Sequence, residues 1–312
     1  MATRITLGGY QGEASVHSRA MRHFCTRLEE LAGGAVEVEF VQNVVERGHK
    51  AADLLSMTEA GELSGCYFSS SYLAGRVPEL GLFDQHFVVP DRRHAYAVLD
   101  GALGAWLARE VEARTGYTLF GYWDNGVRNI SCGVRAIRSP EDCRGLRIRT
   151  LANEDHQRVF RALGFEPVQI DVRDLVEAVA SGRVDAQENP LTNIYNFGLH
   201  RYHRHITMTR HLLGVALVLF NRDEVAGWPD ELRAAVAGAM AEATALQRRL
   251  AEQEDAICAE AMRGEGVELI ELTAEERARF REATRPVVEE IRARFSPELI
   301  AMFESDLAGA GA

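Results

Sequence analysis

Long apolar runs and net positive charge are both missing from this sequence. The longest apolar run, Val215–Phe220, has the length of a strand and falls far short of the roughly 20 residues that a membrane-spanning helix requires. Acidic residues outnumber basic ones by 46 to 35, which gives a net charge of −11. Because nucleic-acid binding needs clustered cations, we expect a soluble protein that does not bind nucleic acid.

Cysteines are few and widely separated, and no two of them form a CxxC pair. The five are Cys25, Cys66, Cys132, Cys143 and Cys258. This spacing argues against a disulfide framework and against a structural zinc site. We expect buried or half-buried thiols, and a single disulfide stays open because the spacing nominates no pair.

The common enzyme signatures are absent as well: there is no GxGxxG, GxxxxGK[ST] or GxSxG motif. Ser69–Ser71 follows a predicted buried strand, at whose carboxyl end a ligand can bind, but no base for a serine nucleophile is identifiable. His200, His203 and His205 have no carboxylate or cysteine close in sequence, so surface histidines are favoured over a zinc site. We therefore expect no metal, no cofactor and no catalysis.

The first residues carry no signal-peptide pattern, since Met1–Arg4 leads directly into a predicted strand. Taken at face value, this start favours the cytoplasm. A mature chain whose signal has been removed would look the same.

The chain has 312 residues, 46% of them hydrophobic, which is enough for two domains with substantial cores. Its N-terminal part alternates strand and helix patterns. The predicted order is strand Arg4–Leu7, helix Ser15–Ala32, strand Val36–Val41, helix Gly48–Ala60 and strand Cys66–Phe68. This order favours an α/β fold with a largely parallel sheet.

A second α/β set follows. Its predicted elements are strand Leu119–Trp123, a polar turn at Asp124–Gly126, strands Asn129–Val134 and Leu146–Thr150, a helix through Arg158–Leu163, strand Pro167–Ile170 and a helix that ends at Ser181. We expect several chain crossings between the two sets rather than a flexible linker.

The C-terminal part, from Trp228 to Leu307, predicts almost continuous helix. Thr273 and Glu276 form a capping box within it. An apolar stripe at helical spacing comprises Leu232, Val236, Leu246, Leu250 and Ile257.

Three motifs carry the strongest signal: PEDCRGLRIRT at 140–150, LGFEPV at 163–168 and GRVDAQENP at 182–190. They resemble the substrate-binding proteins of tripartite ATP-independent periplasmic (TRAP) transporters, the DctP-type family. The family pattern is Pro-x-Asp-x-x-Gly-x-x-x-Arg, a Gly-x-x-Pro turn and Gly-x-x-Asp-Gly-Gln-Glu-Asn-Pro. The resemblance extends over nearly the whole chain, including Asn125–Arg128 and Trp228–Leu232.

The resemblance implies an α/β, two-domain periplasmic-binding-protein clamshell with hinge strands and long C-terminal helices. Domain I would comprise 1–124 plus about 211–250, and domain II 125–210 plus about 251–307. The implied function is reversible capture of a small organic acid in the cleft, closure around the hinge, and delivery to the membrane permease subunits of a TRAP transporter. The implied location is the periplasm, with no nucleotide or other cofactor.

The resemblance also assigns roles at the binding site. Arg149 matches the family's principal arginine, which pairs with the ligand carboxylate, Asn189 the asparagine that hydrogen-bonds the same group, and Arg128 a second arginine that also reaches it. A guanidinium presents a rigid fork to a planar carboxylate, which suits this role. The alternation of the strand gives Arg147 and Arg149 the same face, and the resemblance favours Arg149.

Other positions depart from the sialic-acid-binding branch of the family. Val172 stands where that branch has phenylalanine, Ser69 where it has an acidic contact, and Ala186 where the family usually has glycine. The expected ligand-lining wall comprises Tyr10, Gln11, Ser69, Ser70, Tyr72, Trp123 and Val172, with core packing an equal alternative for Trp123. These departures argue against sialic acid as the ligand.

Two alternatives stay open: a cytosolic enzyme on the same fold, and a ligand sensor that docks on a signalling partner. An assay that measures whether the bound ligand is converted to product would separate the enzyme from the binding protein. Neighbouring permease genes would argue against the sensor.

Overall fold

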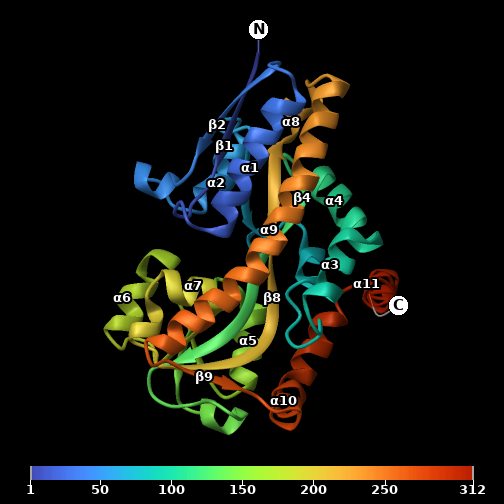
Figure 1. The fold of residues 1–312 in the computed structure, drawn as a ribbon. Helices are drawn as coiled ribbons and strands as arrows, with labels where there is room; N and C mark the ends of the chain where they lie inside the picture. The colour runs from blue at the N-terminus through green and yellow to red at the C-terminus, as the bar shows by residue number, and fades with distance from the viewer. Residues whose placement is uncertain (1, 311–312) are drawn as a thin grey trace. The chain divides into compact units, whose positions relative to one another are not determined.

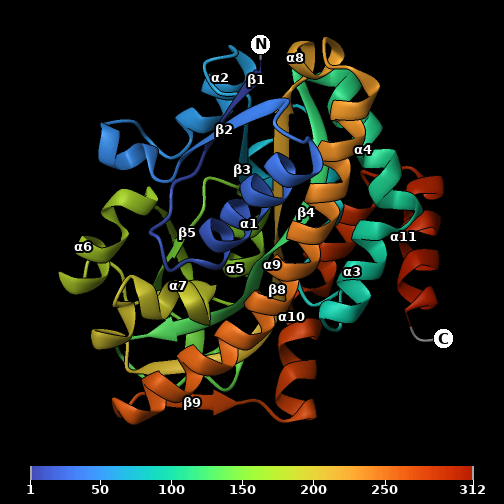
Figure 2. The same ribbon diagram turned by 45° about the horizontal axis from the view of Figure 1, so that its top comes forward.

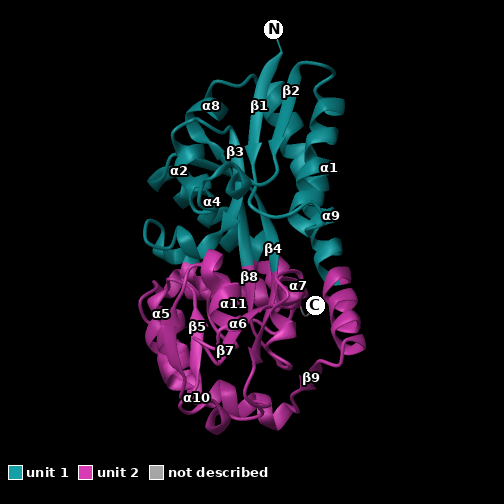
Figure 3. Cartoon of the chain, turned by 90° about the vertical axis from the view of Figure 1, so that its left-hand side faces the viewer, with its two compact units in different colours: residues 1–80, 99–125, 215–252 teal, residues 81–98, 126–214, 253–312 magenta. Residues whose placement is uncertain are grey.

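The computed structural model describes residues 2–310, which divide into two compact units (Figure 3). Unit 1 comprises Met1–Leu80, Leu99–Asn125 and Val215–Glu252, and unit 2 comprises Gly81–Val98, Gly126–Gly214 and Gln253–Ala312. The chain passes from one unit to the other inside the short 3-10 helix Pro78–Leu82, inside helices α3 and α9, and inside strands β4 and β8. The connections are therefore regular secondary structure.

Unit 1 is built on a sheet of strand order β2-β1-β3-β8. Strand β1 pairs in parallel with β2 and β3, and β3 pairs antiparallel with β8. The elements are β1 (Thr3–Gly8), α1 (Val16–Leu31), β2 (Val36–Val41), α2 (Asp53–Glu59), β3 (Gly65–Ser69), α4 (Ala102–Arg114), β4 (Tyr117–Cys132), β8 (His205–Asn221), α8 (Arg222–Ala226) and α9 (Asp230–Gly264), of which β4, β8 and α9 continue into unit 2. The predicted strand and helix order of this part is confirmed.

The core of unit 1 lies between the sheet and the helices α1 and α9, which run side by side (Figure 1). Ser15 caps α1 by accepting a hydrogen bond from the backbone N–H of Ser18. Met21, Phe24 and Leu28 then recur at helical spacing and are fully buried. The apolar face that the sequence predicts for α1 is thus the face that builds the core.

Helix α9 contributes to the cores of both units and is continuous throughout its length (Figure 2). Val236 is buried in unit 1, whereas Cys258 and Met262 are buried in unit 2. The prediction that Ile257 belongs to the apolar stripe is wrong, because its side chain is 60% exposed. Cys258, seven residues after the buried Ala251, lies on the buried face of α9, and Ile257 lies outside that face.

Unit 2 is built on a sheet of strand order β4-β7-β5-β6, and β9 pairs in parallel with β8. Strand β7 is antiparallel to β4 and parallel to β5, which is parallel to β6. Besides the shared elements, it contains α3 (Arg92–Asp100), β5 (Arg147–Thr150), α5 (Glu154–Ala162), β6 (Glu166–Gln169), α6 (Leu175–Ala180), β7 (Ala186–Pro190), α7 (Leu191–Asn196), β9 (Glu268–Glu271), α10 (Ala274–Arg292) and α11 (Pro297–Gly309). The predicted capping box of Thr273 and Glu276 opens α10, but β9 interrupts the predicted helical region.

The predicted turn at Asp124–Gly126 is wrong, because β4 runs through it without a break. The side-chain amide of Gln247 on α9 accepts from the Asp124 backbone N–H at 2.9 Å and donates to the Asp124 carbonyl at 2.7 Å. This amide takes the place of a neighbouring strand. Gly126 has a φ of 88°, and a Cβ there would lie 2.3 Å from Cβ of Pro190, so glycine is required for the sheet and not for a turn.

Residues 81–98 lie in unit 2, although the predicted boundaries put them in domain I. The backbone N–H of Phe87 donates to the carbonyl of His211 at 2.7 Å, and the Phe87 ring packs 6.3 Å from that of Phe280. These contacts join distant parts of the chain, and no local pattern signals them.

The five cysteines are free thiols, four of them buried and Cys25 half-buried, as expected. Burial raises the pKa of Cys66 to about 12. Within residues 2–310, none of the helices is both long enough and apolar enough to cross a membrane.

Candidate functional site

Arg149 is a buried arginine on β5, with a side chain that is only 2% exposed. The strand registers place it opposite Gln187 of β7 and Val168 of β6. Its Nε donates to the carbonyl of Ile170 at 2.8 Å, which fixes the orientation of the guanidinium. Hydrogen bonds from Arg173, together with the nearby charge of Arg149, hold the pKa of Asp171 below its usual value. Burying a charged group is costly unless it is paired and hydrogen-bonded.

Asn189 lies on β7, two residues after Gln187, at the end of a chain of hydrogen bonds. Nδ2 of Asn189 donates to Oε1 of Gln187 at 2.5 Å, and Nε2 of Gln187 donates to Oγ of Ser131 at 2.6 Å. The hydroxyl proton of Ser131 is then left for Nδ1 of His203, 3.0 Å away. Burial lowers the pKa of His203 to about 4, so this ring is neutral and can accept. This series of hydrogen bonds fixes the orientation of the Asn189 side-chain amide, with Nδ2 directed toward Gln187.

Arg128 already has a carboxylate partner within unit 2. Its Nε and Nη2 bond the two carboxylate oxygens of Glu188, the second at 2.7 Å, and Nη2 also donates to the Glu188 carbonyl at 2.8 Å. Nε2 of His211 lies 3.3 Å from the same carboxylate. Burial would raise the pKa of Glu188, but the charge of Arg128 and the hydrogen bonds outweigh it and hold that pKa well below its usual range.

Sequence reasoning missed the pairing of Arg128 with Glu188. The one signal for Glu188 was its place inside the Gln-Glu-Asn-Pro motif, between two residues of the binding site. The registers add a further signal, because β4 places Arg128 opposite Pro190 and so next to that motif.

Arg147, the other arginine of β5, faces a different environment. Its Nε and Nη2 bond the carboxylate oxygens of Asp185 at 2.9 and 2.8 Å, and its side chain is 43% exposed. The structure thus separates two arginines that alternation placed on one face.

The predicted wall residues of unit 1 lie at the ends of β1 and β3. The ring of Tyr10 packs 5.2 Å from Phe68, and Phe68 packs 4.8 Å from Tyr72, which is 43% exposed. The hydroxyl of Ser18 donates to the Gln11 carbonyl at 3.2 Å, which fixes the loop after β1. The structure therefore brings Tyr10 and Tyr72 into contact with the same aromatic ring.

Ser69, Ser70 and Trp123 differ in their accessibility. Ser69 is half-buried at the end of β3, while Ser70 is fully buried and its Oγ has no partner in the described part of the chain. Trp123 is fully buried, and its Nε1 donates to Oγ1 of Thr244 at 3.0 Å. Core packing is therefore the role that the structure favours for Trp123.

Val172 is the predicted wall residue of unit 2. It is half-buried and opens a short 3-10 turn that is capped by Asp171. It follows Ile170, whose carbonyl holds Arg149, by two residues. Val172 and Arg149 thus belong to neighbouring segments of one unit.

The surface interpretation of the histidine cluster is wrong for His200 and His203, which are 1% and 2% exposed. The ring of His200 stacks 5.0 Å from Tyr195, and its Nε2 lies 3.1 Å from a carboxylate oxygen of Glu265. His205 is half-buried. Between residues 2 and 310, no group of three histidine, cysteine or acidic side chains is arranged to hold a metal ion.

The fold is that of two-domain solute-binding proteins. The sugar acid binding protein DctPAm from Advenella mimigardefordensis, solved with galactonate, superposes with a TM-score of 0.92, at 25% identity and 99% coverage of both chains. This likeness confirms the predicted α/β two-domain class.

The chain belongs to the bacterial extracellular solute-binding proteins of family 7, the DctP family, whose model matches residues 7–294. It is 31% identical to the C4-dicarboxylate-binding periplasmic protein DctP of Rhodobacter capsulatus over 88% of this chain and 83% of that protein. It is 32% identical to the uncharacterized protein y4mM of Sinorhizobium fredii over 93% of this chain. The chain spans only about half, 52%, of the length of y4mM.

Family membership confirms the resemblance that the motifs indicate. Members of this family are substrate-binding components of transport systems, so the chain is a solute-binding protein and not an enzyme. The family is an extracellular one.

Proposed function

We propose that this protein captures a small organic acid through a carboxylate group, with Arg149 and Asn189 as the principal partners of that group. The observation that carries the proposal is the buried Arg149 on β5, one strand away from an amide whose orientation is fixed. Related proteins are named for C4-dicarboxylates and for a sugar acid bound as galactonate. All of these ligands carry a carboxylate.

The burial of Arg149 and the hydrogen bond that orients its guanidinium support it as the partner of the ligand carboxylate. Arg128 and Glu188 form a buried ion pair of zero net charge, and Arg147 is paired with Asp185. A bidentate bond from Arg149 to an incoming carboxylate would be both strong and orienting. We retain Arg128 as a second, weaker contact, because its Nη2 lies 3.4 Å from Oδ1 of Asn189.

The hydrogen-bond chain supports a donor role for Asn189. Its Oδ1 accepts from Nδ2 of Asn193 and from Arg128, both at 3.4 Å, and one N–H of its Nδ2 is directed to Gln187. An amide group has two N–H donors. We assign the second donor to the ligand carboxylate.

The remaining contacts would decide which acid is bound. We propose Tyr10, Gln11, Ser69, Ser70 and Tyr72 of unit 1 and Val172 of unit 2 for this role. Aromatic rings and a serine hydroxyl without a partner suit a ligand with both carbon–hydrogen faces and hydroxyl groups.

We further propose that the bound acid is delivered to the membrane permease subunits of a TRAP transporter, and that the protein works in the periplasm. Membership of the DctP family supports both statements. Transport of this type needs no nucleotide at the binding protein.

Mass spectrometry of the ligand carried through purification tests the proposal. The wild-type protein, denatured after gentle purification, should release an organic acid with at least one carboxylate. Arg149→Ala, purified in parallel, should release far less of it, and Arg147→Ala should release as much as the wild type. A neutral ligand, or equal retention by Arg149→Ala, would contradict the proposal.

A further inference from the structure

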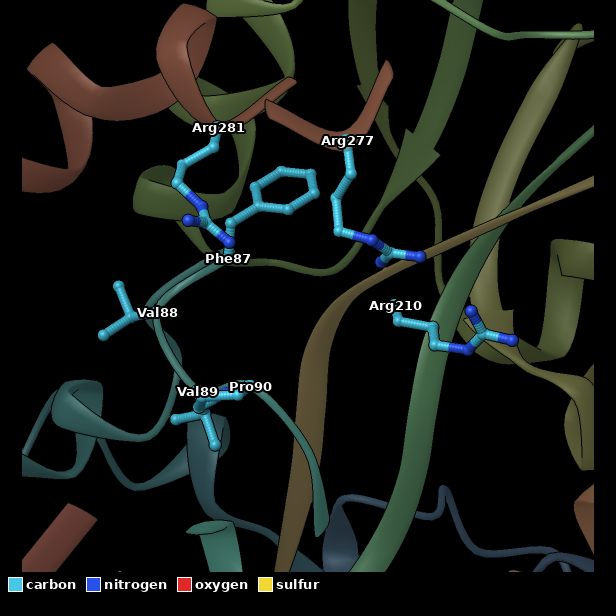
Figure 4. A pocket seen from close by; sticks show the side chains of 7 residues that line it. All are labelled: Phe87, Val88, Val89, Pro90, Arg210, Arg277 and Arg281. Atoms are coloured by element: carbon cyan, nitrogen blue, oxygen red, sulfur yellow. The ribbon is translucent and has the colours of Figure 1, made fainter. Parts of the chain in front are cut away.

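Unit 2 contains a cavity lined by arginines, to which none of the residues proposed above contributes. Its volume is about 410 Å³, within the range of small-molecule sites. One wall is the apolar loop 87–90, and the others carry Arg210 of β8 and Arg277 and Arg281 of α10 (Figure 4). The cavity therefore combines an apolar side with a cationic side.

The three arginines are poorly neutralised by the protein. Arg277 is half-buried, and its Nη1 and Nη2 donate to the carbonyls of Thr209 and Met208 at 2.7 and 3.4 Å, not to a carboxylate. Burial and the charge of Arg210 lower the pKa of Arg277, and Glu271 only partly opposes them. Glu271 itself is paired with Arg210 at 2.8 Å. Glu271 thus acts on both Arg210 and Arg277.

Arg281 adds to the excess of positive charge. It lies four residues after Arg277 on the same face of α10, where like charges repel. In the described part of the chain it has no ion pair and no hydrogen bond to another side chain. A local concentration of cations on a protein with a net charge of −11 attracts anions to this cavity.

Backbone strain marks the same cavity. Phe87 and Arg210, with φ angles of 61° and 44°, are the non-glycine residues that have a left-handed backbone within the described chain, and both line it. A hydrogen bond of 2.7 Å from the Phe87 N–H to the carbonyl of His211 ties the two strained segments together. Strain of this kind persists where the surrounding structure holds a functional arrangement.

We propose that this cavity binds a small organic dianion, a dicarboxylate or a phosphorylated organic acid, at a site separate from the one built on Arg149. The anionic groups would accept from the N–H donors that Arg277 and Arg281 have left over, since a guanidinium has five. The carbon skeleton would pack on Val88, Val89 and Pro90. Arg210, which lines the same cavity from β8, would add a further positive charge.

The test uses succinate and 2-phosphoglycolate as probes and Arg149→Ala as the background, in which binding at the carboxylate site proposed above is weakened. Calorimetric titration should show saturable binding of at least one probe. In ¹⁵N-labelled protein, the probe should shift the amide signals of residues 87–89, 210–211 and 277–281. Because these amide signals locate the bound probe, the result does not depend on whether Arg149 binds the transported acid.

Matched variants on α10 decide whether the arginines are responsible. Adding Arg281→Gln should weaken binding by about tenfold or more, because a hydrogen bond between charged groups is lost. Arg279→Gln removes the same charge from an exposed arginine that pairs with Glu141, and it should leave the affinity unchanged. Absence of saturable binding at millimolar probe, or equal affinities in the two variants, would overturn the proposal.

Position 210 offers an independent readout. Glycine adopts a left-handed backbone without strain, so Arg210→Gly should be more stable to urea than Arg210→Ala. Both variants should bind the probe more weakly than the background protein. Loss of affinity together with relief of strain would support the site, whereas unchanged affinity in both would count against it.

Discussion

At the scale of single residues, the proposed carboxylate site depends on one guanidinium. If Arg149 forms a bidentate bond with the ligand, Arg149→Ala leaves a carboxylate without its partner. Such a truncation costs about 2 to 5 kcal/mol, which is roughly thirty-fold to several thousand-fold in affinity. Arg149→Lys keeps the charge but loses the fork, and its affinity should fall between those of Arg149→Ala and the wild type. Calorimetric titration with the copurified acid measures all three.

Arg147→Ala is the control for this series, because Arg147 lies two residues away and its charge is already paired with Asp185. The control should bind like the wild type, and circular dichroism should show that each variant folds. Binding by Arg149→Ala within a factor of about three of the wild type, less than 1 kcal/mol, would show that the carboxylate partner is another residue.

The roles of Arg147 and Arg149 could not be separated by sequence pattern. Both belong to the same strand, and alternation gives them the same face. Their environments are set by Asp185 and Ile170, which are 38 and 21 residues away in the chain. The family motif, and not local periodicity, identified Arg149 as the candidate.

At the scale of elements, helices and strands with regular apolar spacing could be predicted from the sequence. A strand whose backbone bonds a distant side chain could not. Helix α1 followed from its apolar spacing and its serine cap, since one face of it is buried. Strand β4 was cut short in the prediction, because Asp124–Gly126 reads as a turn. The partner that keeps it extended is Gln247, which lies more than 100 residues away and whose amide no strand pattern reveals.

This bracing of β4 by α9 can be tested with Gln247→Leu. The change keeps the approximate size of a fully buried side chain but removes both hydrogen bonds to the Asp124 backbone. Each lost bond to a buried group costs about 1 to 3 kcal/mol, so the urea midpoint should fall clearly. Gln253→Leu, the same substitution at an exposed position of α9, is the control and should change stability little. Equal midpoints for the two variants would refute the bracing role.

At the scale of the whole molecule, buried histidines predict a loss of stability in acid. Burial is the first cause of a lowered pKa in His17, His86, His203 and His211. For His17 the folded-state pKa is about 4, whereas an unfolded histidine titrates near pH ~6.5. Between these values the unfolded chain binds a proton that the native protein does not, so His17 removes about 1.4 kcal/mol of stability per pH unit as the pH falls.

His17→Phe isolates one of these contributions. The ring of His17 stacks 5.1 Å from Tyr67, and phenylalanine keeps the ring while removing the titrating group. Urea unfolding at pH 7.5, 6 and 5 should therefore show a shallower loss of stability in the variant than in the wild type. An identical pH dependence in the two proteins would mean that His17 takes up its proton in the native state.

The whole molecule also reports ligand binding through its melting temperature. A ligand that binds only the native state, at a hundredfold excess over its Kd, stabilises it by about 2.7 kcal/mol, which is several degrees for a chain of this size. Since the proposed site recognises charge, a screen should find acids that raise the melting temperature while their uncharged amides do not. Succinate against succinamide and galactonate against galactonamide are suitable pairs. The shift should be much smaller in Arg149→Ala, where the arginine-lined cavity still binds a dianion, and it should persist in Arg281→Gln, because the second variant affects only that cavity. Equal shifts from an acid and its amide would mean that the protein recognises the rest of the molecule and not the carboxylate.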